Sequence, residues 1–552
     1  MTSTDRKRYL WIIFSALIQG LLLGIYIIVP SGFIKCMPLT VIFIVPFVFW
    51  LSQEHWGRRL FSFLGWLTLA LIILWLYRIW SIYSPGTGFY YVPSQIPDLI
   101  RVSMAVFLLI PYFQTRIAAW SWDIPYSDIF FQLCRNLFLL FQAAIVIAVF
   151  WGLLVTAGLL FYIVGLDKIP YLVFNPITAV PLTSIIIAIS ISVAIKHPGI
   201  DSLGRWILSV LAWLLPFFSI LSVIFLACLP YSGLKTLWST GQASTLMLLL
   251  QFGTIILANA CWLDGVKSAF RTKSIDLLAQ VSLLCLPIYT GLCLYSVGLR
   301  VEQYGLSTDR IQAFFLTVIT GILGLGYAGA VLFRKWPQSI GRVNIVSVII
   351  MTLIIILMNS PLLDPSRLAA YNQAERLQSG QIKPEEFDYT YTRFNLGRYG
   401  NKVLEILLED SNPEIKSRVN SAMSVDPAEY LNYVRKGIPP VSARQEIITG
   451  AKVYPENKRL SDEQIKFFVE KWPLDGVTRK NDIAFVFIDA VKGENNLILF
   501  TEEEGTIYEL KNFNQVGKIH GKFNLTGLAN INTQESNLLD IDLDGQIYQI
   551  IR

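Results

Sequence analysis

Charged residues are scarce in the first two thirds of this chain, and histidine is scarce throughout. Only 15% of all residues are charged, against roughly a quarter in soluble domains. The three histidines, His55, His197 and His520, stand far apart, which argues against a histidine-based acid–base site or metal cluster. No P-loop, HExxH, GxSxG or kinase signature occurs. The sequence therefore indicates no particular reaction, and we expect neither a cofactor nor a metal.

Cysteine is also rare, and the last third of the chain has none. All six lie in or beside apolar runs: Cys36, Cys134, Cys228, Cys261, Cys285 and Cys293. No CxxC or Cys/His spacing suggests zinc. Disulfides are thus excluded from the C-terminal third.

Long apolar runs dominate the part of the chain before Leu363. They occupy 9–30, 37–51, 61–83, 102–120, 137–164, 177–195, 206–229, 245–262, 275–297, 311–333 and 343–359. Most reach the roughly 20 residues that cross about 30 Å of hydrocarbon. The run 37–51 is short and carries Pro38 and Pro46, while 137–164 is long and is expected to begin as a surface helix near Ile129. We expect an α-helical polytopic membrane protein with about 11 transmembrane helices in residues 1–363.

Loop charges predict the orientation. Residues 1–363 hold 22 Lys+Arg and 11 Asp+Glu, and the remainder holds 23 and 28. With the N-terminus in the cytoplasm, fifteen of the 22 basic residues fall on the cytoplasmic side and seven on the other. Eleven crossings then place the C-terminus outside, in the periplasm of a Gram-negative cell, and one span fewer would reverse this. Because the basic residues belong to these loops, no nucleic-acid partner is expected.

After Leu363 the composition is that of a soluble sequence. Residues 364–438 are predicted to be a helical juxtamembrane segment, in which the first helix stops at Gly380 and others cover 400–409 and 426–434. Residues 439–552 are predicted to be a small soluble α+β domain. EIITGAKVY reads as a strand and SDEQIKFFVEKW as a helix, and IAFVFIDAV, NNLILFTEE, GTIYELKN and QIYQIIR read as mostly antiparallel strands. Glu504-Gly505 and Asp544-Gly545 would be hairpin turns.

Three motifs have a simpler structural interpretation beside the functional one. Asp540, Asp542 and Asp544 match the start of a calcium loop, but Ile551 stands where a bidentate glutamate is required, which favours an acidic turn. The GxGxxG at 324–329 lies inside an apolar run without a preceding strand, which favours close helix packing over phosphate binding. Carboxylates near the membrane surface would suit a transferase but fit helix caps better: Asp123 and Asp128, or Asp264 with Lys267.

Ionisable residues deep inside the apolar runs are few, which disfavours a proton-coupled pump. Arg78 and Arg116 lie near run ends and are expected to snorkel to the membrane surface. The uncharged polar residues are expected to bond neighbouring helices: Gln19, Gln142, Gln251, Asn259 and Gln280.

Two stretches resemble a known family. RVEQYGLSTDR (300–310) and NSPLLDPSRLAAYNQAERLQSGQIKPEEFDYTYTRFNLGRYG (359–400) look like the signatures of a bacterial polytopic inner-membrane family described as domain of unknown function 4153. The resemblance implies a bacterial inner-membrane protein without an assigned reaction, substrate or cofactor.

The residues of these stretches form the candidate membrane-junction site. They are Glu302, Tyr304, Arg310, Asp364, Arg367, Asp388, Tyr389, Arg393 and Arg398. In one interpretation they form salt bridges that dock the helical segment onto the last three spans, and in the other they form a polar binding site.

Three functional hypotheses follow. The first is a non-enzymatic envelope component, a scaffold or a transport or assembly partner, which presents an extracytoplasmic domain to an envelope protein. The second is a membrane-embedded enzyme acting on a lipid-linked substrate at the outer face. The third is an envelope sensor, although no cytoplasmic output domain is visible. In each, the lipid bilayer is the first partner.

Overall fold

The computed structural model describes most of the chain before residue 428 and separate segments after it. The described residues are 3–29, 33–83, 95–119, 125–166, 168–197, 199–232, 243–262, 273–333, 335–336, 338–427, 430, 441–454, 459–471, 484–489, 495–500, 504–509, 515–520, 538–543 and 546–551. Contacts divide the chain into two compact units, Met1–Asn420 and Ser421–Arg552. Residues 364–420 therefore belong with the apolar helices.

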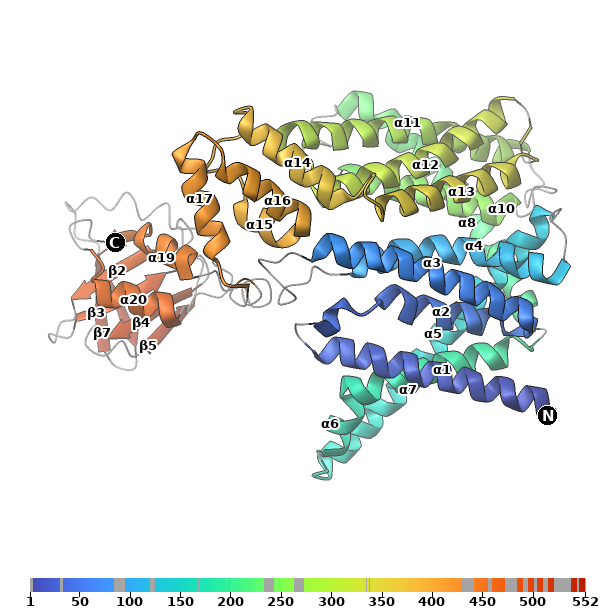
Figure 1. Cartoon of the computed structure of the whole chain (residues 1–552), viewed down its shortest axis with the longest axis horizontal. Coiled ribbons are helices and arrows are strands. Elements are labelled where there is room, and N and C mark those ends of the chain that lie inside the picture. Colours follow the sequence, from blue (N-terminus) through green and yellow to red (C-terminus); the bar gives the residue numbers. More distant parts are fainter. Residues whose placement is uncertain are drawn as a thin grey trace. The chain divides into compact units, whose positions relative to one another are not determined.

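Ten helices among the described residues of the first unit are long and apolar enough to cross a membrane (Figure 1). They are α1 (Ser3–Ile28), α3 (Arg58–Ile82), α4 (Ile96–Ala119), α5 (Tyr126–Ile163), α7 (Pro176–Ala194), α8 (Gly199–Ser232), α10 (Ala243–Trp262), α11 (Lys273–Tyr304), α12 (Thr308–Leu332) and α13 (Ile340–Met358). Large apolar side chains face outward from them; Trp66, for example, is 70% exposed. Such a surface is one that lipid covers. This is the pattern of a multi-pass membrane protein.

The predicted span 37–51 does not reach full length. It forms α2 (Leu39–Leu51), whose 13 residues rise about 20 Å, less than the roughly 30 Å of the hydrocarbon layer. The prediction of about eleven transmembrane helices, with 37–51 as the short one, is confirmed for ten helices of full length, and α2 is the shorter apolar helix. Its apolar run is bounded by Pro38 at the N-cap and by Ser52 and Gln53 at the other end.

The segment around α2 nevertheless connects the two ends of the helical bundle. At one end, the Lys35 carbonyl accepts a hydrogen bond from Gln95, just before α4 begins. At the other end, the Gln53 carbonyl accepts a bond of 3.4 Å from Arg8, near the start of α1. In Figure 1, α2 accordingly runs antiparallel to α1 and α3.

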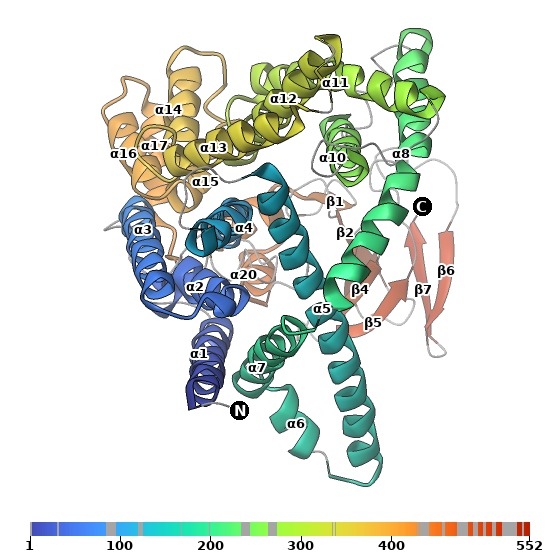
Figure 2. The same cartoon turned by 90° about the vertical axis from the view of Figure 1, so that its right-hand side faces the viewer.

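Two apolar clusters hold the helices in two groups, which Figure 2 separates. The first contains the buried Trp50, Leu139 and Ile191, joins the helices from α1 through α5 with α7, and also includes Met351 and Ile355 of α13. The second contains Trp262 and Tyr327 and joins α8 with α10 to α13. The helix α6 (Lys168–Phe174) lies between α5 and α7 in the chain.

Uncharged polar side chains bond helix to helix inside the bundle, as predicted for four of the five. Gln19 donates to the Phe43 carbonyl at 3.1 Å, and Gln142 and Gln251 accept from the hydroxyls of Ser190 and Thr290. Gln280 instead donates to Asp276 in its own helix.

Asn259, the fourth polar residue that bonds a neighbouring helix, belongs to a closed set of hydrogen bonds. It donates to Tyr327 at 2.8 Å, and Asn344 donates to Asn259 and to Tyr126 at 2.7 Å each. Tyr327 donates to Asn344 at 2.5 Å. The quartet links α5, α10, α12 and α13, which suits an apolar interior where an unpaired polar group is costly.

The GxGxxG run serves close helix packing at two of its three glycines. A Cβ on Gly324 would lie 2.9 Å from the Leu286 Cβ of α11, and one on Gly326 would lie 2.5 Å from a Val343 methyl of α13. A Cβ on Gly329 would meet nothing within 4 Å. The packing prediction is confirmed for Gly324 and Gly326 and is wrong for Gly329.

Four short helices follow α13. They are α14 (Pro365–Gln378), α15 (Tyr389–Asn395), α16 (Gly397–Leu408) and α17 (Pro413–Ser424). The predicted stop after the first is confirmed, since Gly380 has φ +73° and its N–H bonds the Leu377 carbonyl. The predicted helix 400–409 corresponds to α16, and most of 426–434 lies outside the described residues.

The second unit begins with two helices and a strand: α19 (Val441–Thr449), β1 (Lys452–Tyr454) and α20 (Asp462–Lys471). EIITGAKVY is thus helical up to Thr449, and the strand prediction is wrong for that part because its apolar pair, Ile447 and Ile448, packs inward from a helix. Ser461 and Gln464 form a capping box at α20, with each accepting from the other's backbone N–H.

The described strands are β2 (Ala484–Asp489), β3 (Asn495–Phe500), β4 (Glu504–Glu509), β5 (Gln515–His520), β6 (Leu538–Leu543) and β7 (Gln546–Ile551). They pair in the order β1-β2-β3-β4-β5 and β6-β7, antiparallel except for β1 with β2. Glu504-Gly505 opens β4 and is not a turn, because Gly505 pairs with Phe500 and Ile519. Of the calcium motif, Asp540 and Asp542 lie in β6, whereas Asp544 and Gly545 lie outside the described residues. Most segments between the strands do too, so an α+β domain over 439–552 stays a prediction.

Candidate functional site

The two stretches that carry the family resemblance pack against each other at the C-terminal end of α11. Arg376 of α14 donates to the carbonyls of Val301 and Glu302 at 3.1 and 2.9 Å and to that of Gln303 at 3.1 Å. These carbonyls lack partners within the helix, and a cation there also meets the negative end of the helix dipole. Residues 364–420, here called the juxtamembrane platform, are thereby joined to the membrane helices.

The turn between α11 and α12 is held in the same way. Gln373 donates to the carbonyls of Tyr304 and Leu306, at 2.9 Å each, and the Leu306 N–H donates to Asn372. Arg310 donates to the Gly305 carbonyl at 2.8 Å and lies over the Tyr304 ring. The predicted docking thus uses backbone carbonyls and a ring face at Arg310 and Arg376, where salt bridges were expected.

Asp364 is the centre of the junction. It is 1% exposed, and it caps α14 by accepting from the Ser366 N–H at 2.8 Å. Its other carboxylate oxygen accepts from the hydroxyls of Tyr77 and Ser81, both at the end of α3 and both at 2.8 Å. The Tyr77 hydroxyl also lies 3.2 Å from that of Tyr399 in α16. One buried carboxylate therefore connects α3 and α14, and through Tyr77 α16.

The remaining predicted residues lie around the platform. Arg367 donates to the Pro361 carbonyl, and Arg398 donates to the Trp80 carbonyl with its guanidinium over the Trp80 ring. Asp388 caps α15 through the Tyr391 N–H.

Two predicted residues are buried inside the platform. Arg393 is 4% exposed and lies over the Phe394 ring. Tyr389 is 6% exposed, and its burial raises the pKa of the phenol. Neither side chain faces the cavity described next.

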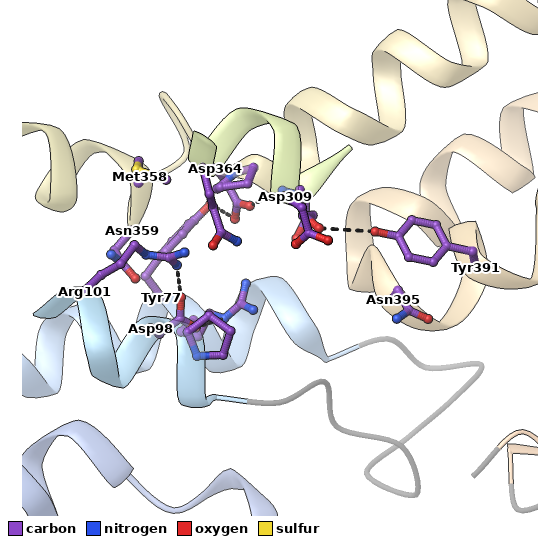
Figure 3. Close-up of a pocket in the computed structure, with 15 residues that line it drawn as sticks. Tyr77, Asp98, Arg101, Asp309, Met358, Asn359, Asp364, Tyr391 and Asn395 are labelled. Carbon is purple, nitrogen blue, oxygen red and sulfur yellow. Dashed lines mark hydrogen bonds and ion pairs between the residues drawn. The ribbon is translucent and has the colours of Figure 1, made fainter. Parts of the chain in front are cut away.

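A small polar cavity of about 180 Å³ lies where α3, α4, α12, α14 and α15 meet (Figure 3). Its polar lining comprises Tyr77, Arg78, Asp98, Arg101, Thr308, Asp309, Gln312, Asn359, Asp364, Ser366, Tyr391 and Asn395. Of the nine predicted residues, only Asp364 lines it. Burial raises the pKa of Tyr391, whose hydroxyl lies 3.2 Å from that of Thr308.

Opposite charges converge on one wall of this cavity. Arg78 Nε lies 2.7 Å from the Asp98 carboxylate, and Arg101 forms a second ion pair with the same group. Arg78 was expected to snorkel; it is instead held by Asp98 because the end of α3 faces the start of α4. Asp98 itself is 6% exposed.

Sequence reasoning overlooked Tyr77, Asp98, Arg101 and Tyr391. A usable signal was present, since Arg78, Asp98 and Arg101 place charges of both signs at the ends of two consecutive apolar runs. Ionisable residues at such positions commonly pair.

Other candidate chemistry does not converge here. Within the described residues, no group of three or more His, Cys, Asp or Glu is placed to hold a metal ion. Asp128 lies in the first turn of α5, whose N-cap is Pro125, and accepts from the Ser127 hydroxyl at 3.3 Å, so the capping role predicted for it is not confirmed. Asp123, Asp264 and Lys267 lie outside the described residues.

Comparison with family models, with curated proteins and with solved structures finds no match to this chain. The resemblance carried by 300–310 and 359–400 accordingly stays a prediction.

Proposed function

We propose that this chain is a multi-pass protein of a bacterial inner membrane, with its N-terminus in the cytoplasm, and that it acts as an envelope scaffold. The juxtamembrane platform would stand at the outer face and present a periplasmic α+β domain, residues 439–552, to an envelope partner. The observation that carries this proposal is the burial of Asp364 between α3 and α14. A platform joined to the membrane helices by buried bonds is a firm attachment for the chain that follows it.

The orientation rests on two observations. Arg8, Arg59, Glu54 and Arg135 meet at one end of the bundle, and fifteen basic residues belong to that side by the count of loop charges. The platform contacts the other end, through Tyr77 and the turn after α11. Because the segment of α2 joins the two ends, α13 reaches the end opposite to the N-terminus.

The cavity favours the membrane-enzyme alternative, since carboxylates and guanidinium groups converge there at a level near the membrane surface. Two features weigh against catalysis. Its volume of about 180 Å³ is below the roughly 300 Å³ at which ordinary ligand pockets begin. Asp98 and Asp364 are both occupied by structural partners, so neither is available as a general base.

Cysteine labelling tests the orientation directly. In a Cys228→Ser background, which removes an exposed native thiol, Glu385→Cys places a thiol on the exposed surface of the platform and His197→Cys places one at the other end of the bundle. A membrane-impermeant maleimide should label Glu385→Cys in intact spheroplasts and His197→Cys only after permeabilisation. The reverse pattern would place the platform in the cytoplasm.

A native purification from membranes, with analysis of bound protein and lipid, separates scaffold from enzyme. The scaffold proposal predicts one envelope protein at near-stoichiometric amount, lost when Asp364→Ala loosens the platform. Conversion of a lipid-linked compound by the purified chain, with no protein partner, would favour the enzyme instead.

A further inference from the structure

On one wall of the junction cavity, two guanidinium groups face one carboxylate. Arg78 and Arg101 share the single carboxylate of Asp98. Two nitrogens of Arg101, Nε and Nη1, are buried and have no hydrogen-bond partner within the described part of the chain. Buried donors left unpaired cost about 1–3 kcal/mol each. A bound acceptor at these two nitrogens would relieve this cost.

The lining holds two further carboxylates, Asp364 and Asp309. Asp364 already accepts from Tyr77, Ser81 and the Ser366 N–H. Asp309, in the first turn of α12, is exposed and makes no hydrogen bond or ion pair with the described residues. The cavity therefore offers guanidinium donors on one wall and a free carboxylate at its exposed edge.

We propose that this cavity binds a phosphoethanolamine headgroup, with its phosphate against Arg101 and its ammonium group at Asp309. Guanidinium groups are the preferred partners of phosphate, and a ligand with both charges matches a lining with both charges. The walls come from the ends of membrane-spanning α3, α4 and α12, with Met358, Pro97 and Pro365 as apolar neighbours, so a phospholipid is the source that the position favours. This binding requires only that the cavity lies near a membrane surface. It does not depend on which side of the membrane that surface faces.

Thermal unfolding of the purified full chain in detergent tests the proposal. Short-chain phosphatidylethanolamine should raise the unfolding midpoint more than phosphatidylglycerol, which lacks the ammonium group, because a ligand that binds only the folded state stabilises it. Soluble phosphoethanolamine is the second arm, and a shift equal to that of the lipid would support the same site with a soluble ligand.

Variants test whether the shift in the unfolding midpoint arises from binding at this cavity. Arg101→Gln should weaken binding about 10- to 100-fold, as expected for lost charge-assisted bonds, whereas Arg300→Gln, an exposed arginine outside the cavity, should not. Asp309→Asn should abolish the preference for phosphatidylethanolamine over phosphatidylglycerol. If Arg101→Gln does not fold, Gln312→Trp, which fills the cavity from α12, should remove the shift.

Three results would overturn the proposal. They are no shift with any phosphoethanolamine compound, an equal shift with phosphatidylglycerol, and equal losses in Arg101→Gln and Arg300→Gln. None of them bears on the orientation, which maleimide labelling decides separately.

Discussion

The Tyr77 hydroxyl donates a 2.8 Å hydrogen bond to the Asp364 carboxylate across 287 positions of sequence. It joins the end of α3 to the N-cap of α14 inside the protein, where a charged acceptor needs its donors. It is one of several bonds that connect the membrane helices with the juxtamembrane platform.

Removing that hydroxyl should destabilise the folded chain. Tyr77→Phe is expected to lower the free energy of unfolding by about 1.5–3 kcal/mol, because it withdraws a donor from a buried carboxylate. Tyr371→Phe, a partly exposed tyrosine of α14, should cost less than about 0.5 kcal/mol. In a double-mutant cycle with Asp364→Asn, a coupling free energy near zero would contradict the bond.

Gly397 brings the start of α16 against the end of α3. Its φ is +56°, and a Cβ there would lie 2.5 Å from the Ser81 carbonyl oxygen. Gly380 has a similar φ of +73° but open space around it. Gly380→Ala should therefore cost only backbone strain, about 1–2 kcal/mol, and Gly397→Ala clearly more. Equal losses in thermal unfolding would show that the close approach to α3 is absent.

Arg376 closes the C-terminal end of α11. Arg376→Gln should lower the unfolding midpoint and raise protease sensitivity in the turn after α11, because the carbonyls of Glu302 and Gln303 lose the guanidinium donor. Lys402→Gln, an exposed cation of the same platform, controls for loss of charge and should change neither. Matching effects of the two variants would argue against capping.

Packing between α12 and α13 depends on Gly326. Gly326→Ala should destabilise by about 1–3 kcal/mol, since its new methyl would press on Val343. Gly329→Ala, three positions later and in open space, should be neutral or slightly stabilising. Reversal of this order in detergent unfolding would contradict the helix packing.

The pH dependence of stability should report His55. Burial lowers the pKa of this imidazole, with Glu54 acting to raise it and Arg135 to lower it. The unfolded chain then binds the extra proton first, at about pH 6.5, so the stability contributed by neutral His55 is complete above that pH and is lost as pH falls through the lower folded-state pKa. His55→Asn should flatten the stability profile between about pH 5 and 7 relative to the unsubstituted chain. An unchanged slope would assign the dependence to other groups.

The sequence predicted the long helices well because an apolar run of sufficient length has few alternatives. The shortest predicted span, 37–51, forms the 13-residue helix α2 between Pro38 and Ser52. The sequence also predicted that 300–310 and 359–400 meet, although on local grounds it expected salt bridges.

The cavity was beyond sequence reasoning, apart from Asp364. The charges of Arg78, Asp98 and Arg101 indicate that the ends of α3 and α4 meet, but no local pattern indicates that the start of α12 and Tyr391 lie beside them. Helix packing decides this, and it depends on shape complementarity along whole helices.

Hydrogen exchange of the full chain in lipid nanodiscs tests most directly whether the platform and the membrane helices form one unit. Amides of α16, whose Val403, Leu404 and Leu407 are fully buried, should exchange as slowly as those of the neighbouring end of α3, and both should speed up together in Asp364→Ala. Rapid exchange in α16 beside a protected α3, unchanged by Asp364→Ala, would contradict the account.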